Sequence, residues 1–245
     1  MRAKRYLEAV RNVLNHIEQS QTDAVDEAAE IVADSIESGG SVYVFGTGHA
    51  GIMAQETFFR AGGLVLFNPV VGPGLTLDVR PVDISSEMER IPGYADIVLA
   101  HTPIREGDVL FVISTAGRNA VPIDAALWAK KRQIPVIAIT SRAWAQSVAS
   151  RHPSGKKLHE VADVVLDDGV PAGDAAVELA GLSYKVGPVS TVAGVALINA
   201  VVVQTADKLL TRGIEPPVIV SANTDGADEI NRRNFERFKD RIHYR

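Results

Sequence analysis

Two stretches of the sequence decide the fold: SVYVFGTGHAG at residues 41–51 and DVLFVISTAGRN at residues 108–119. Each begins with a continuous apolar run and then turns into a polar loop that contains glycine. Such runs are typical of strands that are buried on both faces of a parallel sheet. Ligands of these sheets bind beyond the carboxyl ends of the strands. We therefore look for function in the loops that follow the two runs.

Three more short, β-branched runs predict further strands, at residues 63–67, 135–140 and 162–166. Helical patterns lie between the runs, at residues 49–61, 85–100 and 119–132 and, more weakly, 146–150. The alternation of strand and helix predicts an α/β protein: a doubly wound, five-stranded parallel sheet in a three-layer α/β/α arrangement.

Apolar residues recur at helical spacing before the first strand, which predicts two amphipathic N-terminal helices within residues 1–38. After the fifth strand come a Gly- and Pro-containing stretch (170–188), an apolar helix (190–211) and a polar C-terminal tail (221–245). A length of 245 residues suits one domain. We expect a single domain over residues 1–245, with an α/β core and a C-terminal helical tail in residues 39–245.

Composition excludes several classes of function. A net charge of −5 argues against a nucleic-acid-binding surface. The absence of cysteine excludes thiolate catalysis, disulfides, iron–sulfur clusters and cysteine-ligated zinc. The first residues lack the apolar core of a signal peptide, and the most apolar stretch, 192–203, is shorter than the ~20 residues that cross a bilayer. We expect a cytoplasmic protein that binds neither nucleic acid nor membrane.

The first loop, residues 46–51, fits the G-x-G-x-x-G pattern of a dinucleotide site. That interpretation expects an acidic residue about 20 positions later, to hold the ribose hydroxyls. Residues 66–70 read LFNPV and contain no acid. The pattern therefore disfavours a nicotinamide or flavin cofactor, and a tight packing turn remains as the simpler alternative.

The second loop combines hydroxyls, a glycine and a helix start at Ser114, Thr115, Gly117, Arg118 and Asn119. Exposed amides and the helix dipole at such a place favour an anion, and the arginine adds charge-assisted hydrogen bonds. The alternative is an ordinary N-cap at the asparagine and a strand-end hydroxyl at the serine. Two such loops at adjacent strand ends suit a small phosphorylated ligand.

The residues of both loops, together with Ala54, Glu56 and the stretch FFRAGG at 58–63, resemble the SIS (sugar isomerase) domain. The closest resemblance is to its stand-alone, phosphoheptose-isomerase-like branch of uncharacterised proteins, with further matches at 185–191 and 219–226. The resemblance implies a flavodoxin-like sheet, a phosphosugar at the strand ends, a homodimer or homotetramer, and isomerisation without an organic cofactor. It places phosphate contacts at these residues: Gly46, Thr47, Gly48, Ser114, Thr115, Gly117, Arg118 and Asn119.

The chain also departs from the family pattern. Ala50 and Ala116 stand where members usually carry serines that contact the phosphate. Only Glu56 remains of a frequent pair of adjacent acids, and the late helix lacks the glutamine and histidine of true phosphoheptose isomerases. These departures make a heptose substrate doubtful.

Aldose–ketose isomerisation needs a base at the carbon and a proton donor near the two oxygens. We predict Glu56 as the base and His49 as a phosphate or hydroxyl ligand, about 10 Å apart along the helix by the ~1.5 Å rise per residue. An ion pair of Glu56 with Arg60, four residues on, is the alternative. The histidines show no metal spacing, so no metal is predicted. Two rival functions are a non-catalytic phosphosugar sensor and a purely structural oligomer.

Overall fold

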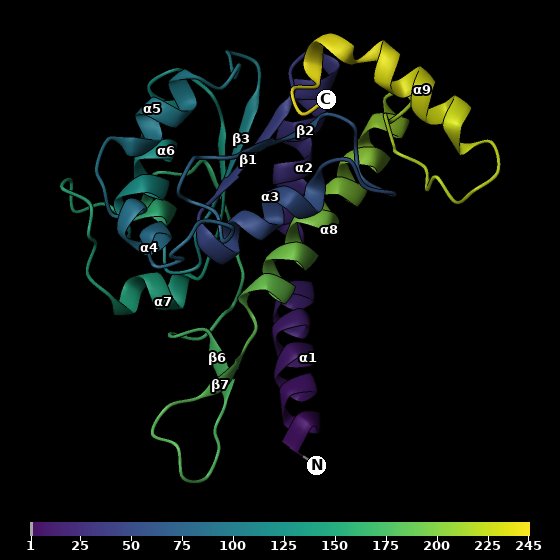
Figure 1. Cartoon of the computed structure of the whole chain (residues 1–245). Coiled ribbons are helices and arrows are strands. Elements are labelled where there is room, and N and C mark those ends of the chain that lie inside the picture. The colour runs from purple at the N-terminus through teal and green to yellow at the C-terminus, as the bar shows by residue number, and fades with distance from the viewer. Residues whose placement is uncertain (1) are drawn as a thin grey trace.

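The computed structural model of the protein describes residues 2–245. Its centre is a five-stranded parallel sheet in the order β2-β1-β3-β4-β5 (Figure 1). The strands are β1 (Val42–Gly46), β2 (Phe67–Val70), β3 (Val109–Ile113), β4 (Val136–Thr140) and β5 (Val164–Asp167). This order confirms the doubly wound, flavodoxin-like prediction. It reverses direction between β1 and β3, which creates a topological switch point at their carboxyl ends.

Both faces of the sheet are buried because successive side chains of a strand point to opposite faces. In β1, Val42 and Val44 enter one hydrophobic core, while Tyr43 and Phe45 enter the other. The strands β3 and β4 alternate in the same way. The continuous apolar runs of the sequence therefore reflect two cores, one on each side of the sheet.

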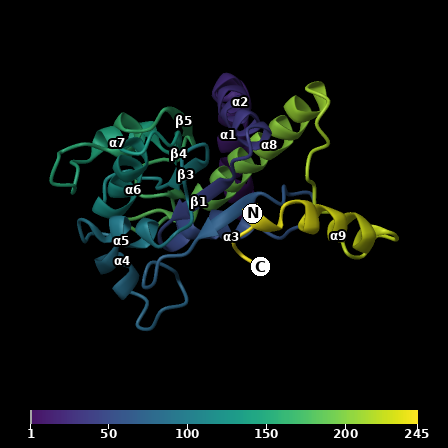
Figure 2. The same ribbon diagram turned by 90° about the horizontal axis from the view of Figure 1, so that it is seen from above.

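Helices cover each face, as the view from above shows (Figure 2). One layer holds α1 (Arg2–Ser20), α2 (Thr22–Glu37), α3 (Gly51–Thr57) and α8 (Ser190–Thr211). The other holds α4 (Ile84–Met88), α5 (Tyr94–Ala100) and α6 (Ala120–Lys130). The remaining helical elements are η1 (Gly48–Ala50), α7 (Arg142–Ser147), η2 (Leu158–Glu160), α9 (Ala227–Arg237) and η3 (Lys239–Arg241). The two predicted N-terminal helices are thus confirmed as α1 and α2.

The predicted strand at 63–67 is wrong, because β2 begins only at Phe67. Residues before it pair instead with the C-terminal part of the chain: Leu64 bridges Val218, and the Val65 amide donates to the carbonyl of Pro217 at 2.9 Å. Leu64 and Val65 are nonetheless fully buried. The apolar run correctly indicated burial, but tertiary contacts with the C-terminal part of the chain determine the backbone conformation there.

The single helix predicted at 85–100 is also wrong, because the chain forms α4 and α5 with a break between them. Pro92 cannot continue the preceding helix, and Gly93 adopts a left-handed conformation (φ 81°) at the start of α5. The predicted helix at 49–61 is shorter, ending at Thr57, because Phe58 is extended and Phe59 has a φ of 48°. The weak helix at 146–150 lies earlier, as α7.

The stretch at 170–188 forms an unpredicted hairpin of β6 (Ala175–Val177) and β7 (Val186–Pro188). The hairpin and the first half of α1 project together beyond the sheet (Figure 1). Asp174 accepts hydrogen bonds from the Val189 and Ser190 amides, at 2.9 and 2.8 Å, and so caps α8. The hydroxyl of Ser190 therefore serves the cap.

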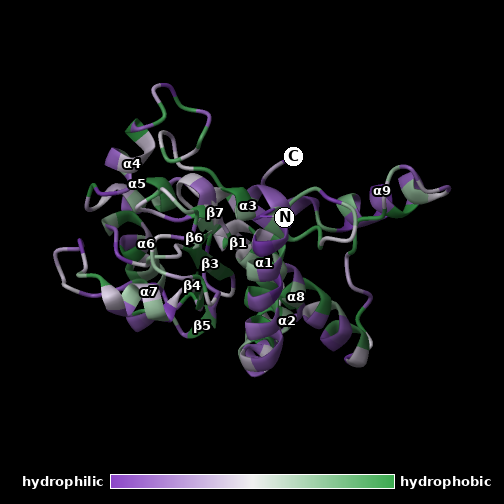
Figure 3. Ribbon diagram, turned by 90° about the horizontal axis from the view of Figure 1, so that it is seen from below, coloured by the Kyte–Doolittle hydropathy of each residue, from purple (hydrophilic) through white to green (hydrophobic). Residues whose placement is uncertain are grey.

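Helix α8 has the predicted bounds, and by length and composition alone it could span a membrane. In the structure one face of it packs against α2 and α3, with Leu197 and Val201 fully buried. Figure 3 shows hydrophobic residues gathered along the sheet strands and hydrophilic ones on outlying helices such as α9. We therefore interpret α8 as a core helix of the α/β domain. The single-domain division stays a prediction.

Candidate functional site

The switch point places the two glycine loops side by side, because Gly46 at the end of β1 is in register with Ile113 at the end of β3. The first loop covers residues 46–51 and the second covers residues 114–119. Ligands of doubly wound sheets bind at this point. The sequence prediction that both loops share one site is consistent with this geometry.

The first loop is a close turn of strand into helix. A side chain at Gly46 would place its Cβ 2.6 Å from the carbonyl carbon and oxygen of Ala50, closer than real Cβ contacts, so glycine is required there. The Gly48 amide donates to the carbonyl of Leu75 at 2.7 Å. The hydroxyl of Thr47 donates to the Glu89 carboxylate at 2.6 Å. The loop is thereby fixed in position before any ligand arrives.

The second loop is held by its carbonyl groups. Those of Thr115, Gly117 and Arg118 accept from the amides of Ser141 (2.9 Å), Leu158 (2.9 Å) and Arg151 (2.8 Å) respectively. Gly117 has a φ of 57°, in the left-handed region. The loop therefore has a fixed shape, with three carbonyls turned toward the segments that follow β4.

The amides of the second loop have no such partners. Within residues 2–245, none of the N–H groups of residues 115–119 donates a hydrogen bond. Helix α6 begins directly afterwards at Ala120, and its N-terminal dipole adds positive potential. Free amides at a helix N-terminus are the elements of an anion site.

Asn119 occupies the N-cap position of α6 but makes no side-chain capping bond, so the ordinary N-cap interpretation is wrong. Its amide group donates to the Glu89 carboxylate, and its carbonyl oxygen accepts from Arg151 Nη1 at 3.1 Å. Glu89 thus links both loops, since it also accepts from Thr47. A ligand would meet these two side chains together with a carboxylate, and their predicted phosphate contacts stay predictions.

The hydroxyls of the second loop have different surroundings. Ser114 is half-buried and its amide continues the sheet by donating to Ile139 at 3.0 Å. The side chain of Thr115 lies beside Asp168, which is 1% exposed. Burial chiefly, with a smaller effect of the neighbouring carboxylates of Asp167 and Asp174, raises the pKa of Asp168 to about 8. A carboxyl that stays protonated at neutral pH therefore backs the loop.

Glu56, the predicted base, and His49, the predicted phosphate or hydroxyl ligand, lie on the consecutive elements α3 and η1. Glu56 lies near the end of α3, where its carboxylate pairs with Arg60 four residues on, as the alternative interpretation expected. His49 lies on η1 and is exposed. Within residues 2–245, no hydrogen bond or ion pair joins His49 to Glu56, or either of them to the second loop. The structure brings together the two loops, and the roles of Glu56 and His49 stay predictions.

Arg118 is half-buried beside the loop that it belongs to. Burial lowers the pKa of its guanidinium, and the positive charges of Arg151 and Arg90 lower it further. Its Nε is inaccessible to solvent and has no hydrogen-bond partner in the described chain, residues 2–245. Arg118, a predicted phosphate contact, therefore lies in a locally positive environment.

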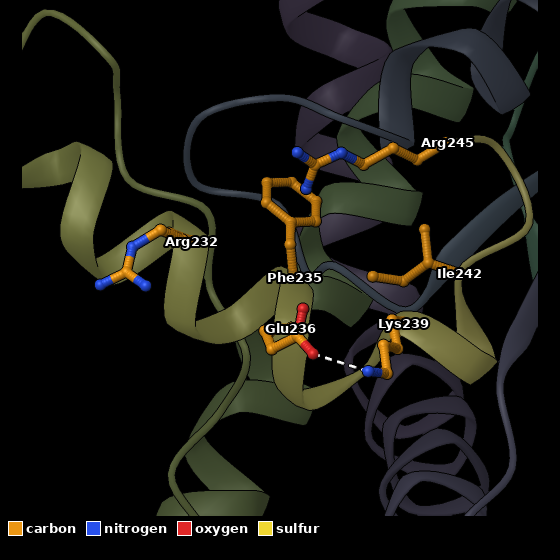
Figure 4. Close-up of a pocket in the computed structure, with 6 residues that line it drawn as sticks. All are labelled: Arg232, Phe235, Glu236, Lys239, Ile242 and Arg245. Carbon is orange, nitrogen blue, oxygen red and sulfur yellow. Dashed lines mark hydrogen bonds and ion pairs between the residues drawn. The ribbon is translucent and has the colours of Figure 1, made fainter.

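A hollow of about 270 Å³ lies elsewhere, in the C-terminal segment. Figure 4 shows its lining: Arg232, Phe235, Glu236, Lys239, Ile242 and Arg245. The adjoining carbonyl of Arg241 accepts from Ser41, just before β1, and from Asn68 in β2. The hollow is thus at the amino-terminal end of β1, away from the loops. Asn68 itself is buried in β2, and its side chain donates to the Arg241 carbonyl and accepts from the His243 amide, so it serves the C-terminal segment.

Two other cofactor classes find no support at the switch point. Strand β2 ends at Val70 and continues as Val71, Gly72 and Pro73, without the acid that a dinucleotide site needs. Among residues 2–245, no group of three His, Asp or Glu side chains is placed to hold a metal ion. Metal binding itself stays untested.

Sequence reasoning missed Glu89, Arg90 and Arg151. All three are distant from the loops along the chain, and they reach Asn119 or Arg118 through tertiary contacts. The one usable signal was the Pro92–Gly93 pair, which marks a helix break just after Glu89. Nothing in the sequence indicated which way the freed segment turns.

Comparisons with known proteins agree with this architecture. A sequence profile described as the SIS domain matches residues 5–141, and the chain belongs to this family. A UPF0309 protein of Shouchella clausii is 44% identical over 241 residues, which cover 98% of each chain. The phosphoheptose isomerase of Neisseria gonorrhoeae has a similar fold, with a TM-score of 0.55, 21% identity and coverage of 84% of this chain and 96% of that one. The NanR protein of Vibrio vulnificus, solved with ManNAc-6P, has a TM-score of 0.51 at 14% identity, covering 96% and 67%.

Proposed function

We propose that the protein binds a phosphorylated sugar or amino sugar between the loops that follow β1 and β3, and isomerises it between aldose and ketose forms without an organic cofactor. One observation carries the proposal: a run of amides at residues 115–119 is unused while three carbonyls of the same loop are anchored elsewhere. A phosphate dianion is the ligand that such a loop and the α6 N-terminus favour.

The loop compensates in part for the missing family serines. Backbone amides do not depend on side-chain identity, so Ala116 still offers its N–H group. Ser114 and Thr115 keep hydroxyls at the same loop. The similarity to a phosphoheptose isomerase and to a protein solved with ManNAc-6P supports a sugar phosphate as the ligand class.

In the proposed reaction, Glu56 removes the proton from C2 of the open-chain aldose while the carbonyl oxygen O1 gains a proton, which gives an enediol. The hydroxyl O2 then loses its proton and Glu56 returns a proton to C1, which gives the ketose. Before it can contact the substrate, the Glu56 carboxylate must break its ion pair with Arg60. The pair is partly exposed and joins the end of α3 to the loop that follows it, so it costs little to break. His49 would contact a sugar hydroxyl or the phosphate from η1.

A second candidate function is phosphosugar binding without turnover. The observation that favours it is the ion pair of Glu56 with Arg60, which engages the predicted base. In this function the free amides of residues 115–119 bind the phosphosugar, and a partner protein binds selectively to the protein with or without the ligand. The anion site is common to both candidates.

We also propose self-association as a dimer or tetramer. Apolar side chains remain exposed on α1 at Leu7 and Leu14, and on α8 at Val203 and Leu210. Exposed apolar side chains mark a protein contact where they form one contiguous patch. Light scattering of the full chain tests this proposal, and a monomer would contradict it. A cytoplasmic location, with neither nucleic acid nor membrane as partner, stays a prediction.

The central experiment has two stages. Calorimetry with hexose, heptose and amino-sugar phosphates tests binding, with the unphosphorylated sugars as controls. Any ligand that binds is then incubated in D₂O, and exchange at C2 is followed by NMR for the wild type and Glu56→Gln. Exchange that the variant abolishes supports the isomerase. Binding without exchange supports the second candidate, and no phosphosugar binding at all would reject both.

A further inference from the structure

Three arginines come from segments that are hydrogen-bonded to one another at the edge of the second loop: Arg118 in the loop, Arg151 after α7 and Arg90 next to Glu89. The Arg151 amide donates to the carbonyl of Arg118 at 2.8 Å, and the Arg151 guanidinium donates to Asn119 at 3.1 Å. The residue before Arg90, Glu89, accepts from the Val121 amide at 3.1 Å and from the Asn119 side chain. These bonds tie the three backbones together around the start of α6.

The three arginines at this edge are not paired with carboxylates. Among residues 2–245, none of Arg90, Arg118 and Arg151 forms an ion pair within 4.0 Å. The Glu89 carboxylate accepts only from the neutral side chains of Thr47 and Asn119, so its single negative charge offsets one of the three positive charges. Burial lowers the pKa of the Arg118 guanidinium, and the positive charges of Arg151 and Arg90 lower it further. The excess of positive charge at this edge favours an anion.

Arg90 and Arg151 belong to segments outside the loop whose amides, at residues 115–119, form the first anion site, and Arg118 belongs to that loop. A phosphate on the amides of residues 115–119 is already held by hydrogen bonds and by the α6 dipole. Arg90 comes from the α4–α5 break and Arg151 from the segment after α7, so both lie outside the loop that forms the cradle. Guanidinium groups bind carboxylates and phosphates through paired hydrogen bonds.

We propose that Arg90 and Arg151, which flank Arg118 at the edge of the second loop, form a second anion subsite, which binds an additional acidic group, a carboxylate or a second phosphate, on the phosphosugar. The inference rests on the proposed function, because the first phosphate occupies the amide cradle. It narrows the substrate class to sugar phosphates that carry a further negative charge.

The test compares matched ligands by calorimetry at one ionic strength. Glucose 6-phosphate against 6-phosphogluconate tests the carboxylate, and fructose 6-phosphate against fructose 1,6-bisphosphate tests the second phosphate. We expect at least one acidic member to bind tenfold or more tightly than its partner. The pair that shows the preference identifies the acidic group.

Variants connect the preference to the arginines. Arg90→Gln should reduce the ratio of affinities to threefold or less, and Arg90→Lys should retain most of it because the charge is kept. Arg11→Gln on α1, also an exposed arginine, is the matched control and should leave the ratio unchanged. Circular dichroism confirms that each variant is folded.

The outcomes separate the two proposals. If the neutral sugar phosphates bind and neither acidic member binds more than twofold more tightly, the second subsite is overturned and the proposed function stands. If the preference persists in Arg90→Gln, the assignment to these arginines is overturned. If no member of either pair binds, the proposed function fails and the subsite fails with it.

Discussion

The Thr47 hydroxyl donates a 2.6 Å hydrogen bond to the carboxylate of Glu89, although the two residues lie 42 positions apart. The other oxygen of that carboxylate accepts from Asn119 in the second loop. One side chain from the break between α4 and α5 therefore connects the two glycine loops at the switch point. The relative position of the loops, and with it the shape of the candidate site, depends on this carboxylate.

Glu89→Ala should lower the free energy of unfolding by roughly 1–3 kcal/mol, because it leaves the buried Thr47 hydroxyl and the half-buried Asn119 amide group without an acceptor. Glu89→Gln should cost less than half as much, since its amide oxygen can still accept from Asn119 and its N–H can donate to Thr47. Urea unfolding followed by circular dichroism gives both values.

The control for this pair is Glu87→Ala, two residues earlier and exposed on α4. It should change the stability by less than about 0.5 kcal/mol, as surface substitutions usually do. Equal losses for the alanine variants of Glu89 and Glu87 would show that the bridge between the loops has no energetic role.

Gly117→Ala should weaken binding of glucose 6-phosphate, or of whichever phosphosugar the screen identifies, by tenfold or more. The added Cβ would lie 2.8 Å from Thr140 Oγ1, so the loop must shift and its amides lose their alignment. The left-handed conformation adds about 1–2 kcal/mol of strain in the folded state.

Gly213→Ala separates strain from site geometry. Gly213 also has a positive φ, 73°, but an added Cβ would meet nothing within 4 Å there. The two variants should lose similar stability from backbone strain, while only Gly117→Ala loses affinity by calorimetry. Unchanged binding in Gly117→Ala would argue that the ligand does not use the second loop.

The strands that form the middle of the sheet could be predicted because their sequence and their burial agree. Residues 41–45, 108–113 and 135–140 lie within one residue of β1, β3 and β4, and their apolar runs enter two cores. The run at 63–67 has the same composition and burial, yet the C-terminal segment takes its hydrogen bonds. Sequence periodicity reports burial and carries little information about which partner the backbone finds.

The candidate site was predicted as two loops and not as a complete set of side chains. The loops follow from strand ends and glycine patterns, which are local features. Glu89, Arg90 and Arg151 reach the site only because α5 starts anew at Gly93 and the segment after α7 folds back onto Arg118. Such contacts depend on the tertiary path of the chain, and a single sequence gives no means of placing them.

Arg212 joins α8 to α2 through three carboxylates, those of Glu30, Asp34 and Glu37. Hydrogen bonds to Glu37 and Asp34 raise the pKa of the guanidinium. Arg212→Gln should lower the melting temperature by roughly 2–5 °C, because it breaks a network between two helices rather than an isolated pair. The difference should shrink in 1 M salt, where charges are screened.

The matched control for this network is Arg232→Gln, which breaks an exposed pair with Glu229 within α9. It should shift the melting temperature by less than about 1 °C, as expected for a local surface pair. A salt-independent loss in Arg212→Gln would point to lost packing of the arginine stem instead of lost charge.

Asp168 should make the stability fall as the pH rises. Its pKa is raised from 3.8 to about 8 in the folded state, chiefly by burial. Between these values the unfolded chain loses the proton and the folded chain keeps it, so the folded state becomes relatively less stable. The stabilising contribution is complete below pH ~4 and is lost as the pH rises toward ~8, by up to about 1.4 kcal/mol per pH unit.

Asp168→Asn removes this titration. The asparagine oxygen can still accept the hydrogen bond that the Val170 amide donates to Asp168 in the wild type, at 3.1 Å. The variant should gain stability relative to the wild type steadily from pH 4.5 to pH 7.5 in urea unfolding. Asp228→Asn, which alters an exposed carboxylate on α9, should show a difference that varies little with pH. A pH-independent difference for Asp168→Asn would mean that this carboxyl is already ionised behind the loop, where its negative charge would oppose a phosphate beside Thr115.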